Sequence, residues 1–342
     1  MKSIDFLIDD ITGSGGTERI TCTLSNELIN LGYKVNIFSL KKGKENTNYV
    51  IDDKVNIIYN HRNKYFFILD ILKKTKKKHS TLIVISMGKL SVLVAMLSII
   101  KKPNNLIFSE HISFESFNPI KKIIKKMSYF FADRVVLLTE NDRTILAKNN
   151  NEKFVTIKNI NPFHNYNVSE FDTRQNIALA IGRLSYQKNF ERLIEIWNKS
   201  EHPDWSLIII GNGDEYSKIS NLISNKSDIT LIKNSSQLED YYNNAKLFLM
   251  TSRFEGLPMV LIEAQYFGIP SISFDCKTGP REIILNNETG YIIPYDNDEL
   301  FKNKLNKLTT DKSAIAKMNK KSLAFSDNFS PNEILKQWIS II

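Results

Sequence analysis

The hydrophobic pattern alternates along the chain between short apolar runs and longer segments of helical periodicity. Between Thr17 and Leu31, apolar residues recur at spacings of three and four, which predicts an amphipathic helix that Gly32 ends. Because β-branched runs precede and follow this segment, the pattern predicts strand, helix and strand in repetition. The predicted strands of the first half are Ile4 to Ile8, Val35 to Leu40, Leu82 to Ile85, Leu106 to Phe108 and Val135 to Leu138.

A polar, aperiodic segment over residues 159–175 interrupts this alternation, which then restarts. A chain of 342 residues exceeds the size of one ordinary core, so two domains are expected. We predict an α/β protein of two Rossmann-like, doubly wound domains, residues 1–165 and 166–328. Residues 329–342 are predicted to form a last helix, opened by Ser330 and Pro331, that crosses back onto the first domain. The second half's predicted strands are Ile177 to Ile181, Leu207 to Ile210, Ile229 to Ile232, Leu247 to Met250 and Ser271 to Phe274.

Residues 81–100 have about the length of a membrane span and contain one charge, Lys89. We interpret this stretch as a buried strand, a turn around Gly88 and a buried helix, because its first part is rich in β-branched residues. The beginning of the chain places Asp5, Asp9 and Asp10 where a signal peptide needs apolar residues, so no secretory signal is expected.

Charge is distributed unevenly between the two halves. Residues 1–170 hold 26 Lys and Arg against 16 Asp and Glu, whereas the remainder hold 20 against 21. A basic first half suggests an anionic partner, which could be a phosphorylated substrate, a lipid surface or nucleic acid. The two cysteines, Cys22 and Cys276, form no metal-binding or disulfide pattern, which favours a reducing compartment.

The clearest chemical signal is SRFEGLPMVLIEAQYFGIPSI at 252–272, in which seven residues separate Glu255 and Glu263. Pro258 suits the first turn of a helix, so Glu255 is predicted before a helix N-terminus and Glu263 in its second turn. The amides of Gly256, Leu257 and Val260 would then offer an anion site that suits a diphosphate. The alternative is that the glutamates only complement the helix dipole.

A second feature in the same domain favours the chemical interpretation. The stretch IGRLSYQKNFERLI predicts a strand that ends at Gly182, with Arg183 and Lys188 in the loop that follows. Cations at the carboxyl end of a strand lie where open α/β sheets bind ligands, and they can stabilise a departing diphosphate.

These motifs, together with GNGD at 211–214 and GIPSISFDCKTGPREII at 268–284, resemble glycosyltransferase family 4 of the GT-B fold. The resemblance extends over nearly the whole chain and implies a donor cleft between the two domains. It implies that Glu263 binds the donor ribose and Glu255 the transferred sugar. It also implies that Arg183 and Lys188 bind the diphosphate, and that the base lies near Lys233 and Asn234.

The turn after the first strand, TGSGGTERI, contributes Gly15 and Gly16, which in similar enzymes let the backbone approach the donor phosphates and the acceptor. The alternative is a dinucleotide-binding loop, but Glu18 stands where the third glycine of that fingerprint belongs. In the sequence SEHISF, His111 follows a strand and resembles the family's active-site histidine, with Glu110 as a weaker candidate.

No metal site or cofactor is expected, because the five histidines are scattered and the Asp296 to Asp298 triplet is typical of a helix cap. The family resemblance implies retention of anomeric configuration, and the sequence offers no evident carboxylate nucleophile. We therefore expect metal-independent, same-face attack in which the leaving phosphate oxygen takes the acceptor's proton.

The predicted function is transfer of a hexose or N-acetylhexosamine from a nucleotide sugar, with UDP as the expected nucleotide, to a glycan or polyprenyl-diphosphate-linked acceptor. The resemblance is to bacterial enzymes that build capsule, O-antigen or other surface glycans. Two alternatives stay open, a nonhydrolysing sugar-nucleotide epimerase and an inactive module that binds sugar nucleotides or membranes. Nucleic acid is not an expected partner, since no base-reading motif accompanies the positive charge.

Two basic runs, residues 71–79 and 119–131, predict an anionic membrane surface as a further partner. In the second run, apolar and basic residues fall on different sides of a predicted helix, as in an interfacial helix. The alternative is an amphipathic helix whose apolar side faces the core. We expect peripheral attachment to the inner face of the cell membrane, in the cytoplasm and without a spanning segment. The apolar residues that share one side are Ile120, Ile123, Ile124, Met127 and Phe131, and the lysines on the flanks and back are Lys121, Lys122, Lys125 and Lys126.

Overall fold

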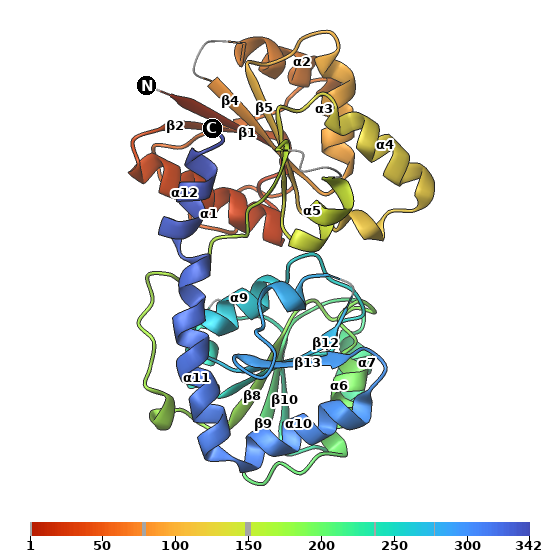
Figure 1. The fold of residues 1–342 in the computed structure, drawn as a ribbon, viewed down its shortest axis with the longest axis vertical. Coiled ribbons are helices and arrows are strands. Elements are labelled where there is room, and N and C mark those ends of the chain that lie inside the picture. The colour runs from red at the N-terminus through yellow and green to blue at the C-terminus, as the bar shows by residue number, and fades with distance from the viewer. Residues whose placement is uncertain (1, 77–79, 148–151, 236, 277) are drawn as a thin grey trace. The chain divides into compact units, whose positions relative to one another are not determined.

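The computed structural model describes residues 2–76, 80–147, 152–235, 237–276 and 278–342, which form two compact units. One unit consists of Met1–Pro162 together with Pro331–Ile342, and the other consists of Phe163–Ser330. Each unit contains one parallel sheet, so the predicted α/β fold of two Rossmann-like domains is confirmed (Figure 1). Lys77, Lys78 and His79 of the first basic run lie outside the described residues.

The first unit has a seven-stranded sheet in the order β3-β2-β1-β4-β5-β6-β7. The strand order reverses between β1 and β4, as in a doubly wound fold. Its strands are β1 (Ser3–Asp10), β2 (Lys34–Lys41), β3 (Asn56–Tyr59), β4 (Ser80–Ser86), β5 (Asn105–Glu110), β6 (Arg134–Leu137) and β7 (Phe154–Thr156). Its helices are α1 (Gly16–Asn30), α2 (Lys64–Lys74), α3 (Lys89–Ser98), α4 (Pro119–Tyr129), α5 (Glu140–Leu146) and α12 (Pro331–Ile339), with a short 3₁₀ turn at Phe114–Ser116.

The apolar stretch at 81–100 forms the predicted buried strand and a helix, but the helix is only partly buried, because Met96, Ile99 and Ile100 are exposed. It folds as β4 and α3, joined by a turn in which Gly88 has a φ of 102°, a left-handed value that suits glycine. Among the helices that the structure describes, none combines the length and apolar character that crossing a membrane requires.

The second unit has a six-stranded sheet in the order β10-β9-β8-β11-β12-β13, which reverses between β8 and β11. Its strands are β8 (Ile177–Ile181), β9 (Ser206–Ile210), β10 (Ile229–Ile232), β11 (Leu247–Met250), β12 (Ser271–Asp275) and β13 (Gly290–Pro294). Its helices are α6 (Phe190–Asn198), α7 (Tyr216–Leu222), α8 (Leu238–Asn244), α9 (Met259–Tyr266), α10 (Asp298–Thr310) and α11 (Lys312–Ser326), with 3₁₀ turns at Phe171–Thr173, Pro280–Glu282 and Asp327–Phe329.

The last helix packs in the first unit, as predicted. Ile334, Leu335 and Trp338 of α12 are buried in the same core as residues of β1, β2 and α1. Burial of two aliphatic side chains and an indole contributes roughly 2 kcal/mol for each residue, which is enough to hold a nine-residue helix in place. The Asp296 to Asp298 triplet caps α10 through its middle residue, because the side chain of Asn297 accepts from the Leu300 amide.

Helix α4 turns its apolar side away from the core, so the alternative of an apolar side that faces the core is wrong. Its buried residues are Lys125, Ser128 and Tyr129, whereas four of the five apolar residues predicted to share one side are exposed. Two assignments are corrected by this orientation. Lys125 is on the buried side, and Phe131 packs against the core while the neighbouring Phe130 is exposed. The apolar residues exposed on the helix are Ile120, Ile123, Ile124 and Met127.

Lys125 forms a buried ion pair that attaches α4 to the sheet. Its Nζ lies 2.6 Å from Oε1 of Glu110, at the end of β5, and 2.6 Å from Oγ of Ser91 in α3. It also donates to the carbonyl oxygen of Gly88 at 3.3 Å. Burial lowers the pKa of Lys125, and the carboxylate of Glu110 acts in the opposite direction. Because Glu110 would otherwise be a buried charge without compensation, this pair fixes the rotation of α4.

Replacing Lys125 by Met should lower the free energy of unfolding of the first unit by about 3 kcal/mol, because Glu110 then stays buried without its cation. Urea denaturation followed by circular dichroism measures the change. The double variant Lys125→Met/Glu110→Leu should recover most of the loss, since a pair replaced by apolar groups leaves no buried charge. Lys121→Met, four residues earlier and exposed, is the control. Equal stability of Lys125→Met and Lys121→Met would contradict the role of the pair.

Candidate donor-binding site

The predicted residues of the second unit converge at the carboxyl ends of two adjacent strands. Arg183 and Lys188 follow β8, and Glu255 follows β11. These two strands pair with each other at the point where the strand order reverses. In open α/β sheets the loops diverge at this point and leave space for a ligand. The topology therefore brings together three side chains that are up to 72 residues apart in the sequence.

Lys188 and Glu255 form a direct ion pair, with Nζ and Oε1 2.7 Å apart. The carboxylate is almost completely buried, and the lysine keeps a small exposed fraction. An ammonium group has three N–H donors, so Lys188 can bind Glu255 and still donate to a phosphate oxygen. Arg183, by contrast, is largely exposed and pairs with Asp214 at 3.3 Å. The site thus offers one cation oriented by a buried carboxylate and one exposed cation paired with a carboxylate at the surface.

Neighbouring loops hold Glu255 in place through residues that the sequence patterns did not indicate. Gln187 donates from Nε2 to the carbonyl oxygen of Phe254 at 2.9 Å and to Oε2 of Glu255 at 3.4 Å. Thr278 donates from its hydroxyl to the carbonyl oxygen of Glu255 at 2.6 Å. Gln187 stands beside Lys188 in the sequence, but its partner is 68 residues away and no local pattern reveals it.

Two glycines allow the loops of this site to approach each other closely. A Cβ on Gly279 would lie 2.4 Å from the carbonyl oxygen of Gly256, and one on Gly213 would lie 2.3 Å from that of Leu184. The φ of Gly279 is 99°, a left-handed value that other residues rarely adopt. The GNGD motif therefore packs one loop against the loop of Arg183, which gives its glycines a steric role.

Glu263 lies in the second turn of α9, where the sequence placed it, and its side chain is buried. Its Oε2 accepts a hydrogen bond of 2.7 Å from the hydroxyl of Tyr242, a residue of α8 that sequence analysis missed. Tyr242 is itself held by aromatic packing, since its ring stacks on Phe267 at 5.3 Å between centroids. A buried carboxylate held in this way has a fixed orientation.

The remaining predicted residues of this unit divide into two groups. Gly256, Leu257 and Val260 lie around the start of α9, next to Glu255. Asn234 is exposed after β10, and β9 separates that strand from β8. The structure does not bring Asn234 together with Lys188 and Glu255.

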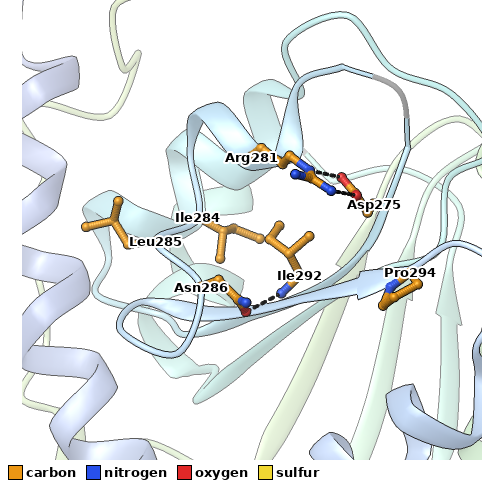
Figure 2. A pocket seen from close by; sticks show the side chains of 7 residues that line it. All are labelled: Asp275, Arg281, Ile284, Leu285, Asn286, Ile292 and Pro294. Atoms are coloured by element: carbon orange, nitrogen blue, oxygen red, sulfur yellow. Dashed lines mark hydrogen bonds and ion pairs between the residues drawn. The ribbon is translucent and has the colours of Figure 1, made fainter.

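A pocket of about 390 Å³ opens beside β12 and β13 (Figure 2). Arg281 and Asp275 form a bidentate ion pair on one side of it, and the side chain of Asn286 accepts from the Ile292 amide on the edge strand β13. None of its lining residues belongs to the predicted donor set, so the pocket adds no support to that set. The lining residues are Asp275, Arg281, Ile284, Leu285, Asn286, Ile292 and Pro294.

In the first unit, the predicted residues follow β1 and β5. Gly15 precedes α1, and a Cβ on it would lie 2.6 Å from Oε2 of Glu18. A Cβ on Gly16 would meet no described atom within 4 Å, so the space around this backbone is open. His111 follows β5, and its Nε2 lies 3.1 Å from the hydroxyl of Ser109. Glu110, the weaker candidate, is buried and paired with Lys125.

Within the part of the chain that the structure describes, no group of three or more His, Cys, Asp or Glu side chains has a metal-binding arrangement. Burial lowers the pKa of His111 to about 4, so its imidazole is neutral near pH 7. A neutral imidazole offers one donor and one acceptor nitrogen, which suits hydrogen bonding to hydroxyl groups.

Comparisons with known proteins assign both halves of the chain to families. Residues 14–160 match Glycosyltransferase Family 4, and residues 164–324 match Glycosyl transferases group 1. The chain is 37% identical to the amylovoran biosynthesis glycosyltransferase AmsD of Erwinia amylovora, with both chains covered completely. It is 26% identical to a Campylobacter jejuni enzyme, the GalNAc-alpha-(1->4)-GalNAc-alpha-(1->3)-diNAcBac-PP-undecaprenol alpha-1,4-N-acetyl-D-galactosaminyltransferase, over 100% of this chain and 98% of that enzyme.

Solved structures share the fold at low sequence identity. A TarM mutant of S. aureus in complex with Fondaparinux, alpha-GlcNAc-glycerol and UDP superposes with a TM-score of 0.82 at 16% identity, over 100% of this chain and 99% of that one. HepE of Anabaena in complex with UDP and glucose superposes with a TM-score of 0.79 at 18% identity, over 99% of both chains. The fold is therefore that of GT-B enzymes.

The lowered pKa of His111 makes stability depend on pH. The usual pKa of histidine is 6.5, and the pKa of His111 in the folded chain is about 4. At a pH between these two values, the unfolded chain binds a proton at this residue that the folded chain excludes. The neutral ring therefore contributes fully to the free energy of unfolding above pH 6.5, and this contribution is lost as the pH falls toward 4. Acidification from pH 7 to pH 5 should cost up to about 2 kcal/mol of unfolding free energy through this residue.

Urea titrations of the wild type and of His111→Gln at both pH values measure this contribution. The variant should lose less stability on acidification than the wild type. The exposed His61→Gln serves as the control and should keep the wild-type pH dependence. If His111→Gln and the wild type lose the same stability, the ring is not held neutral by burial.

Proposed function

The chain belongs to the family 4 glycosyltransferases of the GT-B fold, and on that premise we propose which reaction it performs. We propose that it moves a hexose or N-acetylhexosamine from UDP to a lipid-linked oligosaccharide or a similar glycan, with retention of anomeric configuration, in bacterial surface polysaccharide synthesis. Similarity over full length to AmsD and to an enzyme named for an undecaprenol-linked substrate supports this class of acceptor. UDP in the complexes of two structural neighbours supports the nucleotide.

The observation that carries the proposal is the pair of Lys188 and Glu255 at the switch point of the second sheet. In the proposed donor complex, Lys188 and Arg183 bind the diphosphate. Two cations there stabilise the negative charge that grows on the β-phosphate as the sugar leaves, without a metal ion. The amides of Gly256, Leu257 and Val260 at the start of α9 add partial positive charge.

The two glutamates have separate roles in this proposal. Glu263 accepts hydrogen bonds from the ribose hydroxyls, and its bond from Tyr242 keeps one carboxylate oxygen in a fixed position. Glu255 binds hydroxyl groups of the transferred sugar. Its ion pair with Lys188 holds the residue that binds the sugar next to the residue that binds the diphosphate. A bound donor therefore has its C1–O bond aligned with Glu255 and Lys188. Asn234 is assigned to the nucleoside base.

The chemical step we propose is same-face substitution. The bond between C1 of the sugar and the β-phosphate oxygen breaks, and C1 bonds to the acceptor oxygen on the face that the phosphate leaves. The acceptor's proton passes to the departing phosphate oxygen. Charge is thereby balanced without a protein nucleophile. Following the family resemblance, His111 is assigned to the transferred sugar, and Gly15 and Gly16 to backbone contacts with phosphate and acceptor.

We also propose that the protein works in the cytoplasm, attached peripherally to the inner face of the cell membrane. The excess of basic residues in the first 170 supports an anionic surface as the partner. A polyprenyl-linked acceptor is confined to that surface, so attachment would bring enzyme and acceptor to the same plane.

Charge removal at the donor site should lower turnover. Arg183→Ala and Lys188→Ala should each reduce kcat by about 10- to 1000-fold, because they remove stabilisation that grows toward the transition state. Glu263→Ala should raise the Kd for the nucleotide sugar instead. Steady-state kinetics and thermal-shift titration with UDP-sugars separate the two effects. Lys218→Ala, an exposed lysine on α7, is the matched control. Wild-type kinetics in all three site variants would refute the assignment.

Retention predicts the stereochemistry of the product. A product made from an α-linked UDP-sugar should carry an α-glycosidic bond, because leaving and attack occur on one face of the ring. The coupling constant of the anomeric proton in the NMR spectrum reports the configuration directly. A β-linked product would exclude same-face attack, and release of an epimerised sugar nucleotide without transfer would favour the epimerase alternative.

A further inference from the structure

Three neighbouring helices of the first unit expose large apolar side chains on their outer side. Helix α3 contacts α2 on one side and α4 on the other. The three helices cover one face of the sheet, where they share a single core (Figure 1). Because their buried residues face that core, their exposed residues face away from the unit. We define the outer apolar face by these residues: Phe66 of α2; Met96, Ile99 and Ile100 at the end of α3; Ile120, Ile123, Ile124 and Met127 of α4; and Phe130, which directly follows α4.

The α4 part of this face is unusually apolar for a protein surface. Ile120 is 70% exposed, Ile123 and Met127 are each 61% exposed, and Phe130 is 80% exposed. Single exposed apolar residues are ordinary, but these recur at spacings of three and four and so form one continuous stripe. Contact between such a stripe and water is unfavourable by roughly 25 cal/mol for each square ångström of exposed apolar surface. Such surfaces mark sites of interaction.

The buried ion pair prevents α4 from turning its stripe inward. Lys125 lies on the side opposite the stripe and is 2% exposed. A rotation that buried Ile123 and Met127 would carry Lys125 into solvent and separate it from Glu110. It would also leave the Glu110 carboxylate buried without a cation, which is costly. The exposure of the stripe is therefore a property of the folded domain.

The charge around the outer apolar face indicates its partner. Between residues 87 and 131 the chain has seven lysines and two glutamates. The pair of Lys125 and Glu110 is buried, so six lysines and one glutamate, Glu115, stay available to the surface. Lys121 and Lys126 are exposed on α4 itself, which contains no acidic residue. An apolar stripe flanked by ammonium groups complements the boundary between acyl chains and anionic headgroups.

We infer that the outer apolar face inserts into an anionic phospholipid bilayer, with the stripe of α4 in the acyl boundary and Lys121 and Lys126 at the headgroup phosphates. This inference rests on the proposed function for its membrane partner and adds the surface and the mode of binding. Attachment is both apolar and electrostatic, so high salt weakens it without abolishing it. It also sets the orientation of the first unit, since three helices of one layer face the bilayer.

Sedimentation of the full chain with vesicles of phosphatidylcholine and phosphatidylglycerol tests the surface. Ile123→Ser/Met127→Ser should lower binding at least tenfold, at low and at high salt. Lys121→Gln/Lys126→Gln should lower binding only at low salt. Val50→Ser, an exposed apolar residue of the same unit outside the outer apolar face, is the matched control and should bind as the wild type does.

Insertion can be observed directly in Phe130→Trp. The native tryptophans Trp197, Trp205 and Trp338 are all buried, so a tryptophan at 130 would be distinguished by its exposure. Its emission should shift to the blue on vesicle binding, and brominated acyl chains should quench it. Val50→Trp should show neither change. Quenching equal to that of Val50→Trp would overturn insertion.

Two further outcomes would also overturn the inference. One is unchanged vesicle binding by Ile123→Ser/Met127→Ser. The other is a lipid-free dimer in sedimentation velocity that these substitutions dissociate, because the face would then bind a second copy of the chain. Thermal-shift titration with UDP-sugars keeps these results separate from the proposed function. Loss of vesicle binding with intact donor binding supports the membrane surface, whereas absence of donor binding in the wild type contradicts the transferase itself.

Discussion

Parallel pairing of every strand is the constraint on which both units depend. When all strands run in one direction, their carboxyl ends lie on one edge of the sheet, and so do the loops that follow them. The reversal of strand order between β8 and β11 separates two of these loops. Lys188 and Glu255 come from those loops and meet across the gap. The proposed donor site is thus a consequence of topology, and the motifs supply the side chains that the topology gathers.

Two buried carboxylates of this protein are each held by a specific partner on another element. Glu263 of α9 is bonded by Tyr242 of α8, and Glu110 of β5 is paired with Lys125 of α4. Because an uncompensated buried charge is so unfavourable, such contacts fix the orientation of the elements that carry them. In the second unit, the bond from Tyr242 orients Glu263, the residue that we propose to bind the ribose. In the first unit it determines which side of a helix meets the surroundings.

The comparisons and the chemistry complement each other. Full-length similarity to AmsD establishes the family, and superposition on solved structures, with TM-scores of 0.82 and 0.79, establishes the fold. Neither identifies which groups hold a particular substituent of a sugar. That information lies in contacts such as those of Gln187 and Thr278 with the Glu255 loop, which restrict the positions that its carboxylate can adopt. In the proposed site, specificity follows from groups of this kind, because a misplaced or absent hydroxyl leaves a buried polar atom unpaired.

The sequence by itself determined the α/β alternation, both parallel sheets, the positions of the charged residues at strand ends and every described strand except β3, β7 and β13. It did so because hydrophobic period and turn residues are local properties of the chain. Periodicity also placed the apolar residues of α4 on one side, but it says only which residues share a face. The tertiary structure decided that this face points outward and that Lys125 is buried. It also decided the partners of Glu110, Glu255 and Glu263, since contacts between distant elements leave no periodic trace in the sequence.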